Sequence, residues 1–117
     1  MGESAGTPTD SGASSLGRRA VPRYTLIATA EIVDLASDMR MSGRISEISR
    51  KGCYVDVLNP LPVGSLINVR ISRDQGTFIS PGEIIYVQEG MGMGVGFRDL
   101  AADQLKILDS WLAELPS

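Results

Sequence analysis

Two short stretches of this chain combine residue types that can hold a phosphate or a nucleobase. The first is an arginine pair, Arg19-x-x-x-Arg23, and the second is Glu47-x-Ser49-x-x-Gly52. A guanidinium presents planar, forked donors that fit phosphate oxygens and the O6/N7 edge of guanine, and it also stacks on a base. A serine hydroxyl can donate to either group, and a glycine lets the backbone approach closely.

Residue types that the chain lacks narrow the function further. It has no histidine and a single cysteine, Cys53. This excludes Ser-His-Asp and Cys-His catalysis, imidazole metal ligands, disulfide bonds and multi-cysteine zinc sites. A hydrolase built on the carboxylates of Asp34 and Asp38 has no second feature to support it. We therefore expect a binding module that is not an enzyme and needs no metal or cofactor.

The charge of the chain, formally -3, is unevenly distributed. Residues 18–51 hold seven basic and four acidic residues, whereas residues 74–117 hold two basic and seven acidic ones. Nine of the eleven basic residues are arginine. This pattern favours an anion site in the first half, although a mixed solvated surface would also produce it.

The N-terminal region differs in composition from the rest. Residues 1–17 are mostly Gly, Ser, Ala and Thr and predict a disordered tail, because they cannot bury enough apolar surface to offset the entropy of ordering. Residues 18–23, with Pro22, form an extended linker that enters a single domain spanning 18–117.

Apolar residues then alternate with polar ones, which is typical of half-buried strands. Pro81-Gly82 indicates a bulge or a sheet edge, and Asp74-Gln75-Gly76 a hairpin turn. The inward-facing set is expected to include Met39 and Met91. The predicted strands cover residues 24–34, 38–46, 52–58, 65–72, 77–88 and 91–97.

The last segment changes to helical periodicity. Leu105, Leu108, Leu112 and Leu115 predict a helix over about residues 100–115, with Asp99 as a candidate N-cap. Its apolar stripe is expected to cover one end of a barrel. The predicted fold is mainly β: a six-stranded antiparallel β-barrel with one C-terminal α-helix and a disordered N-terminal tail.

No apolar run approaches the roughly 20 residues that a membrane helix needs, and the N-terminus has no signal-peptide pattern. The expected location is therefore the cytoplasm, without a membrane span.

The order of these features resembles the PilZ domain family, bacterial receptors for cyclic di-GMP. The family pattern is Arg-x-x-x-Arg followed by Asp/Asn-x-Ser-x-x-Gly, and Arg19, Arg23, Ser49 and Gly52 match it. Glu47 stands where the family has Asp or Asn. The resemblance extends over residues 18–115 and includes residues 92–97, which look like the family's closing strand.

The resemblance implies a receptor that binds cyclic di-GMP, orders its linker around the ligand and passes the signal to an unknown downstream protein. An extra arginine before the pair, Arg18, suggests that a second ligand molecule could stack on the first. The expected ligand-binding residues are Arg18, Arg19, Arg23, Glu47, Ser49 and Gly52.

Other interpretations stay open at this point. The chain could be a divergent PilZ-like domain that binds cyclic di-GMP weakly or not at all and acts through protein contacts. Nucleic acid is not an expected partner, because the net charge is negative and only Tyr24 and Tyr54 lie near the basic segment.

Several single residues also have plain structural readings. Glu47 could be a surface acid paired with Arg44 or Lys51, and Arg40 could share a solvated face with Arg44. Arg50 and Lys51 are expected to be turn charges. Cys53 is expected to be a buried apolar residue.

Overall fold

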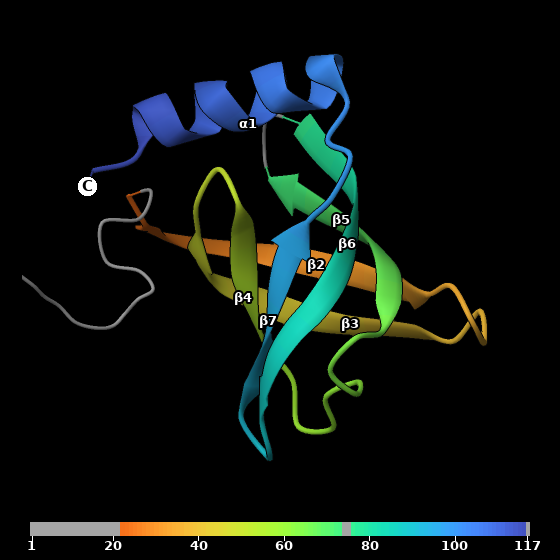
Figure 1. The fold of residues 1–117 in the computed structure, drawn as a ribbon. Coiled ribbons are helices and arrows are strands. Elements are labelled where there is room, and N and C mark those ends of the chain that lie inside the picture. Colours follow the sequence, from red (N-terminus) through yellow and green to blue (C-terminus); the bar gives the residue numbers. More distant parts are fainter. Residues whose placement is uncertain (1–21, 74–75, 117) are drawn as a thin grey trace, which may run out of the picture.

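The computed structural model describes residues 22–73 and 76–116. The predicted tail, residues 1–17, lies outside this part of the chain, as do most of the linker and Asp74-Gln75 of the predicted turn. The described elements are β2 (Tyr24–Asp34), β3 (Arg40–Ile48), β4 (Gly52–Asp56), β5 (Leu66–Arg73), β6 (Gly76–Gln88), β7 (Gly92–Phe97) and α1 (Ala102–Glu114) (Figure 1).

The strands form one closed antiparallel barrel, which confirms the predicted fold class. Neighbours follow the order β2-β3-β4-β7-β6-β5, and β5 pairs back with β2. The period-two pattern explains the inside of the barrel: on β5, Ile67, Val69 and Ile71 are fully buried while the residues between them are exposed. Closure gives each strand a ladder partner on both sides.

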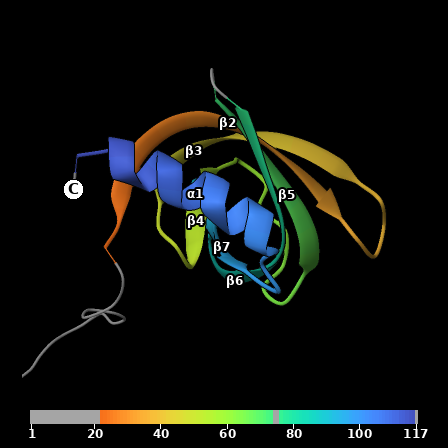
Figure 2. The same cartoon turned by 90° about the horizontal axis from the view of Figure 1, so that it is seen from above.

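Helix α1 covers one end of the barrel, as Figures 1 and 2 show from two directions. Its buried side chains are Leu108, Trp111 and Leu112. The Trp111 ring lies 6.1 Å from the ring of Phe78 on β6, centroid to centroid. Burying each large apolar side chain contributes about 1.5–3 kcal/mol, so this seam holds the helix on the barrel. No helix in the described ranges is long and apolar enough to cross a membrane.

The start of the helix differs from the prediction. Ala101 is the N-cap residue and offers no side-chain hydrogen bond, and the helix begins at Ala102. Asp99 instead adopts a left-handed backbone conformation with φ of 47°, which short polar residues tolerate better than most. Asp99 therefore turns the chain between β7 and α1 rather than capping the helix.

Two methionines that the alternation placed inside are exposed. Met39 and Met91 are 57% and 64% exposed, because each precedes the first residue of its strand. Met93, inside β7, is fully buried as expected. Alternation predicts burial only where a residue belongs to a ladder.

The Pro81-Gly82 signal marks the point on β6 where the ladder with β7 ends, and not a bulge. Strand β6 runs through both residues, and β7 ends opposite Gly82. Pro81 lies opposite Asn68 of β5, and on its other side its carbonyl accepts the Arg98 backbone N–H at 2.9 Å, just beyond the end of β7. The irregularity of the β6–β7 ladder lies further along, between Ile84 and Tyr86.

Candidate ligand-binding site

The turn between β3 and β4 carries the second predicted motif and is held by its own serine. The Ser49 backbone N–H donates to the Gly52 carbonyl at 2.8 Å, and the Ser49 hydroxyl donates to the same oxygen at 3.4 Å. The Ser49 hydroxyl also accepts the Lys51 backbone N–H at 3.1 Å. Such local side-chain bonds are typical of serine in turns. Ser49 is thus buried in the turn that it shapes.

Gly52 occupies a position where a side chain has no room. It pairs with Gly96 in the ladder between β4 and β7. A Cβ atom at Gly52 would collide with the carbonyl oxygen of Val95. Glycine is therefore needed for the two backbones to approach, whether or not a ligand is present.

The acidic residue of the second motif contacts an arginine of the first. Arg23 Nη1 lies 3.3 Å from Glu47 Oε1, and the two side chains are 56% and 43% exposed. The register places Glu47 opposite Thr25, so β2 brings Arg23 alongside β3. The sequence offered Arg44 or Lys51 as surface partners for Glu47, and the structure gives it Arg23 instead.

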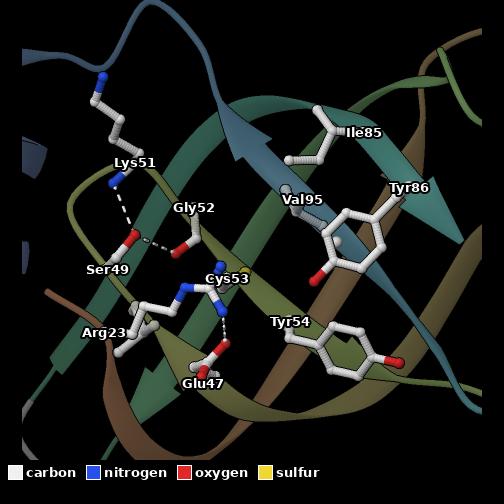
Figure 3. Close-up of a pocket in the computed structure, with 12 residues that line it drawn as sticks. Arg23, Glu47, Ser49, Lys51, Gly52, Cys53, Tyr54, Ile85, Tyr86 and Val95 are labelled. Carbon is white, nitrogen blue, oxygen red and sulfur yellow. Dashed lines mark hydrogen bonds and ion pairs between the residues drawn. The ribbon is translucent and has the colours of Figure 1, made fainter. Parts of the chain in front are cut away.

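These residues lie along one groove on the outer surface of the barrel, with a volume of about 200 Å³ (Figure 3). Strands β3, β4, β6 and β7 supply its walls and floor. One side is polar and the other mostly apolar. Its lining includes Arg23, Glu47, Ser49, Lys51 and Gly52, and also Tyr54, Ile85, Tyr86 and Val95.

Four predicted site residues meet in this groove: Arg23, Glu47, Ser49 and Gly52. Arg18 and Arg19 lie outside the described residues. Their place in the sequence puts them just before Arg23, which stands at the edge of the groove.

The charged residues beside the motifs take different positions. Arg50 is more than a turn charge: its Nε lies 2.9 Å from Asp109 Oδ1 on α1, so the turn is tied to the helix. Lys51 lines the groove. Arg40 and Arg44 are exposed on β3 and do not line the groove, which agrees with a solvated face.

Tyr86 is one of the groove residues that sequence reasoning missed, with Tyr54, Ile85 and Val95. It lies on β6, far along the chain from the basic segment, and the β4–β7–β6 order brings it beside Tyr54. Their ring centroids are 6.0 Å apart. One available signal was the spacing of Gly92, Gly94 and Gly96, which leaves the outer face of β7 open for neighbouring rings.

Burial raises the pKa values of two residues that line the groove, Cys53 and Tyr86. Burial raises the pKa of the Cys53 thiol from its ordinary 9.0 to about 12, so the thiol stays protonated and behaves as an apolar core group. Burial also raises the pKa of Tyr86, an effect that the nearby Arg23 charge opposes. The groove therefore presents neutral phenols beside one guanidinium–carboxylate pair.

Comparison with known proteins places the chain in a family. The family model described as "PilZ domain" matches residues 17–114, so the chain belongs to the PilZ domain family, which comprises receptor domains for cyclic di-GMP. The family resemblance predicted from the sequence is thus confirmed. A search of curated proteins finds no match.

Solved structures share the fold at low sequence identity. The PilZ domain of YcgR from Escherichia coli, solved with c-di-GMP, is 14% identical, with a TM-score of 0.71 over 85% of this chain and 92% of that one. The PilZ domain of CeSA from a cellulose-synthesizing bacterium is 17% identical, with a TM-score of 0.62 over 79% and 96%. MotI/DgrA, the inhibitor of motility from Bacillus subtilis, is 13% identical, with a TM-score of 0.67 over 84% and 53%.

Proposed function

We propose that this protein is a non-enzymatic receptor for cyclic di-GMP. The observation that carries the proposal is the contact between Arg23 and Glu47, which joins the two motifs on the wall of one groove. The ligand-binding set is Arg18, Arg19, Arg23, Glu47, Ser49 and Gly52. The proposal keeps the cytoplasmic location expected from the sequence.

Arginine provides the attraction and the geometry. Arg19 and Arg23 pair with a phosphate or with the O6/N7 edge of guanine through two parallel hydrogen bonds. In the free protein Arg23 lines the groove, where its guanidinium pairs with the Glu47 carboxylate. Because an anionic ligand competes with the Glu47 carboxylate for Arg23, the ion pair has to loosen on binding.

The turn contributes a fixed surface. Ser49 stays hydrogen-bonded within the turn. It also lines the groove, where its hydroxyl group is the polar group offered to the ligand. Gly52 lets β4 and β7 approach closely and so forms this part of the groove wall, because a Cβ atom there would meet the Val95 carbonyl oxygen.

The signal in this proposal is the ordering of the linker, residues 18–23, over the bound ligand. Amide relaxation with and without cyclic di-GMP tests this step. We expect the linker, residues 18–23, to be mobile in the free protein and ordered in the complex. A linker that is equally rigid in both states would contradict the switch.

Arg18 sets the proposed stoichiometry. Its guanidinium directly precedes the arginine pair and can stack on a second ligand molecule, giving a stacked pair for each chain. A titration that saturates at one ligand per chain would leave the receptor function intact and reject the pair.

A second candidate is a divergent PilZ-like domain that binds cyclic di-GMP weakly or not at all and acts through protein contacts. The observation that favours it is Glu47 itself, which replaces the family's Asp or Asn and neutralises Arg23. Calorimetric titration with cyclic di-GMP separates the two candidates, with GTP and a short DNA duplex as control ligands. Saturable binding of cyclic di-GMP alone, with the ligand recovered intact, supports the receptor; absence of heat supports the second candidate.

A further inference from the structure

The ring of Tyr86 lies over the backbone of β7. Tyr86 is opposite Gly94 in the β6–β7 ladder, next to the irregularity at Ile84/Tyr86. A Cβ atom built at Gly94 would lie 2.6 Å from Cζ and 2.7 Å from Cδ2 of this ring, which is too close for any side chain. Gly94 therefore allows the ring to lie across the strand.

A second tyrosine repeats the arrangement two residues earlier on β7. The Tyr54 ring covers Gly92, where a Cβ atom would lie 2.7 Å from Cε2 and Cζ. The Tyr54 hydroxyl donates to Gln88 Oε1, which holds this ring in place. With centroids 6.0 Å apart and planes at 31°, the two rings form a tilted aromatic strip on the outer face of β7.

Tyr86 is the member of the strip that faces the polar side of the groove. It is 43% exposed, although it is a large aromatic residue. Figure 3 shows its hydroxyl end reaching from β6 toward the middle of the groove, on the side where Arg23 lies. Within the described residues the Tyr86 hydroxyl has no side-chain partner of the kind that Gln88 provides for Tyr54.

We propose that Tyr86 is the base-stacking residue of the site, with a guanine ring lying on its exposed face while Arg23 takes the polar edge or the phosphate. This inference rests on the proposed function. It adds an apolar contact, the Tyr86 ring, to a site whose other proposed contacts are mostly polar. Aromatic stacking discriminates poorly between bases, so Tyr86 supplies affinity and Arg23 supplies the choice of guanine.

Stacking of one base on an aromatic side chain strengthens binding by about tenfold. We therefore expect Tyr86→Leu to weaken cyclic di-GMP binding by about tenfold in calorimetry. Tyr86→Phe keeps the ring and should bind within about threefold of the native protein. Met91→Leu is the matched control, since Met91 is an exposed residue of the same hairpin that does not line the groove.

A direct readout of stacking is NMR on the native protein, with two variants as references. The chain has three tyrosines, and selective isotope labelling gives three ring systems, of which Tyr86→Phe identifies one. We expect contacts between guanine H8 and the Tyr86 ring protons in the complex, and an upfield shift of H8 that is lost in Tyr86→Leu.

The outcomes distinguish this inference from the function on which it rests. Native protein that binds cyclic di-GMP without Tyr86 contacts, together with a Tyr86→Leu variant of unchanged affinity, would overturn the stacking role alone. Native protein that binds no cyclic di-GMP would overturn both.

Discussion

Replacing Glu47 by aspartate should tighten the binding of cyclic di-GMP. In the free protein the Glu47 carboxylate lies 3.3 Å from Arg23 Nη1, where it competes with an anionic ligand. Aspartate is shorter by one methylene, so its carboxylate withdraws by about one carbon–carbon bond, ~1.5 Å. The ion pair is then lengthened beyond direct contact, and Arg23 is released toward the groove. The change also restores the Asp that the family pattern has at this position.

The magnitude follows from the exposure of the pair. Both side chains are about half exposed, so solvent screens the ion pair and its loss costs the fold no more than about 1 kcal/mol. One hydrogen bond gained by the ligand contributes about 0.5–1.5 kcal/mol. The gained hydrogen bond and the lost competition of the ion pair together give an expected gain of about 1–2 kcal/mol in binding, roughly 5–30-fold in Kd, with little change in thermal stability.

Calorimetry on the native protein, Glu47→Asp and Glu31→Asp measures this effect. Glu31 makes the control because it undergoes the same change of side chain on β2, outside the groove. An affinity of Glu47→Asp that equals the native value would show that Glu47 takes no part in binding. An affinity that falls while Glu31→Asp stays unchanged would show that glutamate contacts the ligand directly and that the competition argument is wrong.

Three further predictions test other parts of the reasoning. Arg23→Ala should weaken cyclic di-GMP binding by about 2–4 kcal/mol in calorimetry, and Arg40→Ala by less than about 0.5 kcal/mol; equal small losses would indicate diffuse charge attraction instead. Gly52→Ala should lower the free energy of unfolding by more than about 2 kcal/mol in denaturant titration, because its methyl group meets the Val95 carbonyl; a native-like midpoint would show that the ladder can shift. Cys53 should resist alkylation in the folded protein, and rapid labelling at pH 8 would contradict its burial. Its raised pKa should lower the free energy of unfolding only as the pH rises from about 9 to about 12, because below pH 9 the thiol is protonated in both the folded and the unfolded protein.

The sequence was sufficient for the architecture because one face of each strand is buried. Ile67, Val69 and Ile71 alternate with exposed residues on β5, and a register slip would turn all three outward. The change of period after Phe97 indicated the helix equally well. Strand ends were less predictable: Met39 and Met91 continue the alternation in sequence but lie where no ladder continues.

Contacts between residues far apart in sequence were beyond prediction from one chain. The Arg50–Asp109 pair joins residues 59 positions apart, and Tyr86 reaches the groove only because β6 and β4 flank β7. Pattern reasoning places residues on faces of strands, whereas such contacts depend on barrel closure and on where the helix crosses the barrel.

Two motif residues serve the fold as well as the site, and this affects how the motif can be tested. Ser49 closes the turn through its own hydroxyl, and Gly52 permits the contact between β4 and β7. Changing either residue alters the groove wall before any ligand is considered, so a loss of binding there carries little information about contacts. Arg23 and Tyr86 are substantially exposed, and truncating them leaves the barrel core untouched. Substitutions of these exposed residues on the two sides of the groove therefore measure ligand recognition separately from the stability of the fold.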